Sequence, residues 1–130
     1  MTYILKTDAV SEALDKAVNL KGGDYVYEKL PLDGSGASCR YSTNDGAPSC
    51  LVGFVIAEVA PELFAEIVEY EAAYSTSVGV LELVDEFDIE FESADLEYAL
   101  SYAQEKQDES YTWGEAQAAY YRTVERAAED

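Results

Sequence analysis

The chain has 130 residues, 48% of them apolar, with 27 acidic side chains, 8 basic ones and no histidine, so its formal net charge is −19. This length and apolar content predict one domain with its own hydrophobic core, and the 12% of aromatic residues exclude a disordered acidic tail. The charge argues against direct binding of nucleic acid, whose affinity comes largely from Lys and Arg contacts with phosphate, and against docking on anionic membranes.

The first element predicted along the chain is a helix. Apolar residues recur at helical spacing over residues 7–20, Thr7 or Asp8 is suited to cap the start, and Gly22-Gly23 is suited to end the helix. Glycine commonly ends helices because it adopts positive φ without strain.

A β-hairpin is predicted to follow this helix. Residues 24–29 read as a strand around Tyr25-Val26-Tyr27, and residues 39–41 read as a short second strand. The segment 30–38, which contains Gly and Pro, would form the loop between them, and Asn44-Asp45-Gly46 turns the chain again.

Two helices are predicted in the middle of the chain. Residues 49–59 are apolar nearly all round, which is typical of a helix at the centre of a core, so the part from residue 51 onward is expected to be the most buried element. Pro61 suits the first turn of the next helix, over residues 61–70 or beyond. Residues 75–79 are expected to form a linker.

Two more helices are predicted in the C-terminal part. Ser93 is suited to cap a helix that runs to Gln107, and Thr112-Trp113-Gly114-Glu115 matches the capping box that opens a helix to about Ala127. The sequence therefore predicts a helix-rich α+β fold, a single acidic domain over residues 1–130 in which five or six helices pack around a small β-hairpin.

Several features of the sequence bear on its compartment. No run of 18 apolar residues occurs, so no transmembrane helix is predicted, and the N-terminal segment lacks the charged and apolar regions of a secretory signal. The protein is therefore expected in the cytoplasm. Cys39 and Cys50 are expected to remain thiols in that reducing compartment, with a disulfide between them as the alternative.

The acidic residues concentrate in the middle of the chain. Residues 41–105 carry 15 acidic side chains and no basic one. From Glu86 to Glu92 the acids alternate with Phe87, Ile89 and Phe91, which predicts a strand with one apolar face and one row of carboxylates about 6.6–6.8 Å apart.

This acidic segment has two interpretations. One is a solvated edge whose charges prevent aggregation, as natural sheet edges commonly need. The other is a row of phosphate-like charges offered to a protein that normally grips DNA or RNA. The candidate residues for such binding are Glu82, Asp85, Glu86, Asp88, Glu90 and Glu92, with Glu62, Glu66 and Glu69 of the preceding helix as a second row.

Enzymatic and metal chemistry find little support in the residues. Cys50 stands at a predicted helix N-terminus, which lowers the pKa of a thiol, but a cysteine nucleophile usually relies on a neighbouring base and the chain has no histidine. Its apolar neighbours favour a buried, structural cysteine. Asp85, Glu86 and Asp88 do not match an EF-hand loop, so no dedicated metal site and no cofactor are expected.

Four short motifs resemble small uncharacterised proteins of actinobacteria and their bacteriophages. They are Cys39-Arg40-Tyr41, Pro48-Ser49-Cys50-Leu51-Val52-Gly53, Gln107-Asp108 and Thr112-Trp113-Gly114-Glu115-Ala116. The resemblance is spread over roughly residues 24–118, and it implies a phage or prophage origin and a small accessory protein rather than a metabolic enzyme. An acidic protein of that origin is expected to bind and disable a host factor.

These observations predict a non-enzymatic protein that binds a basic host protein, in the extreme case as a nucleic-acid mimic or inhibitor. Two alternatives stay open. One is a small carboxylate-based enzyme that uses Mg²⁺. The other is an acidic surface that serves only solubility in high salt.

Overall fold

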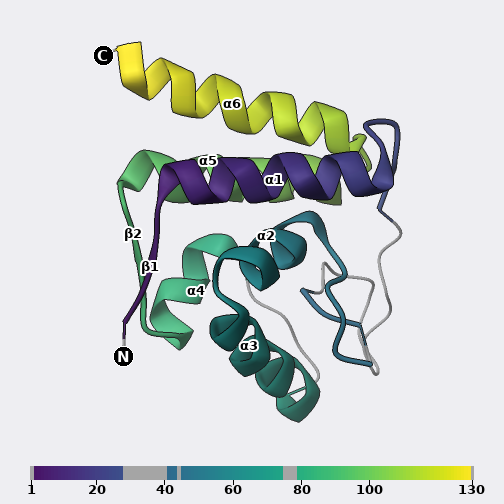
Figure 1. The fold of residues 1–130 in the computed structure, drawn as a ribbon, viewed down its shortest axis with the longest axis vertical. Coiled ribbons are helices and arrows are strands. Elements are labelled where there is room, and N and C mark those ends of the chain that lie inside the picture. Colours follow the sequence, from purple (N-terminus) through teal and green to yellow (C-terminus); the bar gives the residue numbers. More distant parts are fainter. Residues whose placement is uncertain (1, 28–40, 44, 75–78, 130) are drawn as a thin grey trace.

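The computed structural model describes residues 2–27, 41–43, 45–74 and 79–129, and it confirms the predicted helix-rich α+β class (Figure 1). Within these ranges the elements are β1 (Tyr3–Leu5), α1 (Thr7–Lys21), α2 (Leu51–Val59), α3 (Pro61–Tyr74), α4 (Val80–Glu86), β2 (Ile89–Phe91), α5 (Ala94–Asp108) and α6 (Trp113–Glu129). The five longer helices lie where the sequence places them, and α4 is an additional short one.

The helix α2 lies at the centre of the domain, as predicted. It packs against α1 on one side and α3 on the other, while α5 and α6 pack along each other (Figure 1). Of its nine residues only Glu58 is exposed, and Leu51, Val55 and Ile56 belong to the main hydrophobic core. A helix that is apolar on all sides is stable only when neighbours cover every side, which is the position that α2 occupies.

The sheet differs from the predicted hairpin. Its two strands, β1 and β2, pair in parallel and come from opposite halves of the chain, with Ile4 in register with Glu90. Tyr25, Val26, Tyr27 and Tyr41 lie outside any strand, while residues 28–40 of the predicted hairpin fall outside the described residues.

The segment after α1 does not form a hairpin strand because its backbone carbonyl groups bond to α6. The carbonyl oxygen of Tyr25 accepts a hydrogen bond from the Trp113 amide (2.8 Å), and that of Gly23 accepts one from the Gly114 amide (2.9 Å). The rings of Tyr25 and Trp113 also pack edge to face at 4.8 Å. The segment therefore satisfies the exposed amides of the first turn of α6 instead of pairing in a hairpin.

Helix capping follows the sequence in part. Ser93 caps α5 through the Leu96 amide (3.1 Å), and Thr112 and Glu115 form the predicted capping box at α6. The expected cap of α1 by Thr7 or Asp8 is wrong, because both residues lie inside the helix and Lys6 precedes it without a side-chain bond.

The acidic segment around residue 86 also differs from the prediction. The alternation from residue 86 onward predicts a strand, but Glu86 is the last residue of α4 and the strand proper covers only Ile89–Phe91. The helix forms because Val80 and Leu83 lie three residues apart and bury one face. Its first amide donates to the side chain of Gln104 on α5 (3.2 Å). Across the described chain, none of the helices is both long and apolar enough to cross a membrane.

Candidate functional site

The nine carboxylates predicted to bind a partner are all exposed, and they lie on three elements. Glu62, Glu66 and Glu69 are on α3, Glu82, Asp85 and Glu86 are on α4, and Asp88, Glu90 and Glu92 lie in and beside β2. Over residues 87–92 acidic side chains are exposed while the apolar ones between them are buried or half-buried, as the alternation predicts. All nine carboxylates are therefore accessible to a partner.

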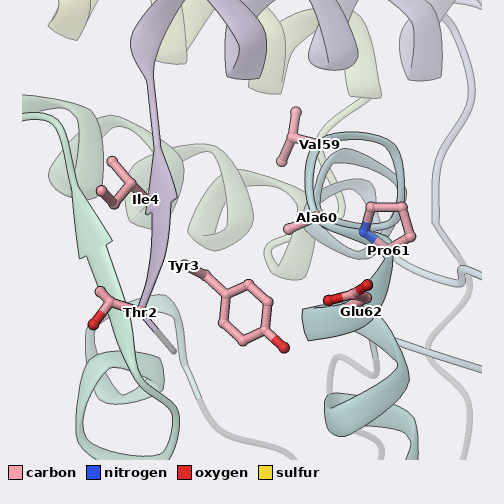
Figure 2. Close-up of a pocket in the computed structure, with 7 residues that line it drawn as sticks. All are labelled: Thr2, Tyr3, Ile4, Val59, Ala60, Pro61 and Glu62. Carbon is pink, nitrogen blue, oxygen red and sulfur yellow. The ribbon is translucent and has the colours of Figure 1, made fainter.

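The strand β1 joins the α3 carboxylates to those around β2. The Thr2 hydroxyl donates to the Asp88 carboxylate (3.0 Å), and the Tyr3 hydroxyl donates to Glu66 on the other side. Figure 2 shows Tyr3 pointing from β1 towards the start of α3, while Thr2 and Ile4 point the other way, towards β2. The hydrogen bond to Glu66, followed by burial, raises the pKa of Tyr3 to about 12.

One carboxylate of the row at β2, that of Glu92, has a structural role in addition to being exposed. A carboxylate oxygen of Glu92 accepts a hydrogen bond from the Thr7 amide (3.1 Å), at the start of α1. The hydrogen bonds from Thr7 lower the pKa of Glu92, and the charge of Lys6 lowers it further. Glu92 thus supplies the negative charge that stabilises the N-terminus of α1. Lys6, which lies outside the segment 41–105 that has no basic residue, partly neutralises this charge.

Glu90 is the row member that faces solvent beside an apolar residue. It lies in register with Ile4, whose side chain is 58% exposed. Asp88 binds Thr2 and Glu92 binds Thr7, so their carboxylates have structural partners. Among the three, Glu90 is therefore the best-placed residue to bind a partner.

Two lysines near helix ends lie over aromatic rings. The ammonium group of Lys21 lies 5.4 Å from the ring centre of Tyr25, and that of Lys106 lies 5.3 Å from Tyr102 and 4.8 Å from Tyr111. Both lysines stand at the ends of α1 and α5 that lie away from the two strands (Figure 1). Their charges are therefore engaged at a distance from the carboxylates around β1.

A groove of about 350 Å³ runs between β1 and the corner where α2 meets α3 (Figure 2). Its lining is mostly apolar and consists of Thr2, Tyr3, Ile4, Val59, Ala60, Pro61 and Glu62. Sequence reasoning missed it because its two walls are more than 50 residues apart in the chain. No local pattern of the sequence marks it, because Ile4 is exposed between Tyr3 and Leu5 only once the chain is folded.

Cys50 occupies the structural position that the sequence predicts. Its side chain is 0% exposed, and its sulfur accepts a hydrogen bond from the Gly53 amide (3.4 Å) at the start of α2. Cys39 lies outside the described residues. No group of three or more acidic or cysteine side chains is placed to hold a metal ion in the described parts of the chain.

One buried carboxylate was not singled out from the sequence. Glu71 on α3 is 2% exposed and accepts hydrogen bonds from the amides of Tyr41 and Ser42 (both 3.0 Å) and from the Ser42 hydroxyl (2.6 Å). The signal was its spacing of four from the buried Ile67, which puts it on the inner face of α3. Glu71 is thus a structural residue that holds residues 41–42 on α3, not part of the exposed surface.

No protein-family model matches this chain, and neither the curated proteins nor the solved structures contain a significant match.

Proposed function

We propose that this protein is a non-enzymatic accessory protein that binds a basic protein partner through its acidic surface. The observation that carries the proposal is the placement of exposed carboxylates on both sides of β1, with Glu66 bonded to Tyr3 and Asp88 bonded to Thr2. This brings acids from α3 and from β2, which are distant in the sequence, to one strand. A net charge of −19 would also steer a basic partner towards this surface.

The partner proposed is a host protein with a basic surface, of the kind that grips DNA or RNA. Carboxylates at strand spacing would occupy the places that phosphates take on such a surface, so the protein would act as a nucleic-acid mimic. The resemblance to actinobacterial phage proteins supports a phage origin and hence action in the host cytoplasm. Direct binding of nucleic acid or membrane is not part of this proposal, because both carry negative charge.

The proposal is tested by affinity capture from host lysate at low and moderate salt. A specific basic partner should bind at low salt and be released at moderate salt, because exposed charges are screened over about 8 Å at physiological ionic strength. The captured partner should also lose its hold on DNA or RNA when the acidic protein is added. Absence of any salt-sensitive partner would contradict the proposal and favour the solubility alternative.

Two charge-matched variants separate the proposed surface from bulk charge. The test variant combines Glu62→Gln, Glu86→Gln and Glu90→Gln, three exposed acids on α3, α4 and β2. The control combines exposed acids elsewhere, Asp24→Asn, Glu105→Gln and Glu125→Gln. Both variants remove the same charge, so only the test variant should lose most of its affinity. Equal losses would show that net charge alone drives binding.

A further inference from the structure

Among the residues that the structure describes, no strand covers the edge of β1 that faces away from β2. We propose that the groove beside this edge receives an extended segment of the partner protein that contains Lys or Arg and adds to β1 as a neighbouring strand. This inference rests on the proposed function and names the part of the partner that the surface binds.

Ile4 lines the groove, and its backbone groups do not bond to β2. The Tyr3 amide donates to the Asp88 carbonyl (2.8 Å), and the Leu5 carbonyl accepts from the Glu92 amide (2.8 Å), so both residues bond towards β2. Alternate residues of a paired strand direct their backbone groups to opposite sides, so the N–H and C=O of Ile4 face away from β2. In the described sheet β2 is the one neighbour of β1.

The groove offers room and an apolar wall for such a segment. Figure 2 shows β1 standing between β2 and the corner formed by Val59, Ala60 and Pro61. The volume of about 350 Å³ is in the range of small binding pockets, and much of its lining is apolar. An added strand would therefore bond to Ile4 through its backbone and place an apolar side chain against the α2–α3 corner.

The charges around the groove select a basic segment. Glu62 lines the groove and Glu66 is bonded to Tyr3, while Glu90 lies across β1 in register with Ile4. Successive side chains of a strand point to opposite faces, so basic residues on either face of the added strand would meet a carboxylate. A second copy of this chain does not fit, because two molecules of net charge −19 repel each other.

The first experiment uses a synthetic peptide in which Lys and Val alternate, with blocked ends, and measures its dissociation constant by titration calorimetry. A second peptide of the same sequence carries N-methyl groups on alternate amides, which removes its backbone donors and keeps its charge. Because a single hydrogen bond is worth about a fivefold change in affinity, methylation on the bonding edge should weaken binding about fivefold or more. Methylation of the opposite edge is the control and should change the affinity little.

The second experiment replaces Ile4 by proline in the full-length protein. Proline removes an N–H that makes no bond to β2, and edge strands tolerate proline at such a position. Ile4→Pro should therefore keep the helical circular dichroism of the unchanged protein and bind the unmethylated peptide about fivefold more weakly or worse. The methylated peptides test the other bond of the same edge, from a peptide N–H to the Ile4 carbonyl, without altering the protein, so an unfolded variant would not leave the question open.

The outcomes separate this inference from the proposed function. Equal affinity of both methylated peptides and of the Ile4→Pro variant would overturn strand addition while leaving a charge-driven acidic surface in place. A neutral peptide of alternating Thr and Val that binds as tightly as the Lys–Val peptide would overturn the basic segment. A dimer in sedimentation analysis that Ile4→Pro dissociates would assign the edge to a second copy instead. Failure to capture any salt-sensitive basic partner would refute the proposed function itself.

Discussion

Replacing the buried Glu71 by glutamine should destabilise the fold, because its two carboxylate oxygens hold residues 41–42 on α3. One oxygen accepts from the Tyr41 amide (3.0 Å), and the other accepts from the amide (3.0 Å) and the hydroxyl (2.6 Å) of Ser42. Glutamine offers one acceptor oxygen and an NH₂ group that only donates. Whichever way this amide turns, at least one backbone donor of the segment faces another donor.

The size of the effect follows from these contacts. A hydrogen bond to a charged group contributes about 1.5–3 kcal/mol, and a buried donor left unsatisfied costs about 1–3 kcal/mol. Both figures describe partly the same lost contact, so they do not simply add, and we expect Glu71→Gln to lower the free energy of unfolding by about 2–4 kcal/mol. That is a large fraction of the roughly 6–20 kcal/mol typical of a domain of this length.

Urea unfolding followed by circular dichroism measures this loss as a lower midpoint at unchanged slope. The matched control is Glu69→Gln, which removes the same charge from an exposed position on the same helix. Surface substitutions of this kind usually change stability by about 0.5 kcal/mol or less. If Glu71→Gln and Glu69→Gln shifted the midpoint equally, the assignment of Glu71 as a structural carboxylate would be refuted.

Three further predictions follow from single contacts. Absorbance titration should show Tyr3 and Tyr121 ionising near pH 12, and Glu66→Gln should move the pKa of Tyr3 back towards 10 while leaving Tyr121 unchanged. Because the folded-state pKa is raised, the stability that this bond contributes is present below pH 10 and is lost as the pH rises towards 12. Glu92 has a lowered pKa, so the stability that its carboxylate contributes is present above pH 4.5 and is lost as the pH falls below that value. The free energy of unfolding of a Glu92→Gln variant should therefore fall less steeply with decreasing pH than that of the unchanged protein. Gly53→Ala would place a Cβ in a clash with the Tyr41 carbonyl oxygen. Thermal unfolding should therefore reveal a loss of about 1–3 kcal/mol instead of the gain that alanine usually brings to a helix.

The long helices could be predicted because their signals are local. The inner stripe of α5 and the caps at Ser93 and Thr112 involve residues within one or two turns of each other, so spacing alone identifies them. The same holds for the exposure of the carboxylates around β2, where alternation reports which side of the chain is buried. Such patterns predict an element and its buried face, but not its neighbours.

The tertiary structure decided the contacts between distant segments. The predicted hairpin is absent from the described residues. The carbonyl groups of Gly23 and Tyr25 do not pair with another strand but accept hydrogen bonds from the first amides of α6. Helix α4 extends through Glu86 although the alternation there suggests a strand, because Val80 and Leu83 are buried and Gln104 caps its first amide.

The candidate surface depends most on these distant contacts. Around β2 the sequence alone indicated which carboxylates are exposed, but it did not indicate that β1 lies between them and the carboxylates of α3. The pairing of Ile4 with Glu90 joins residues 86 positions apart, and no local periodicity encodes a partner at that separation. Only when the core between α1, α2 and α5 is packed does β1 come to lie between α3 and β2, and with it the groove and the carboxylates on its two sides.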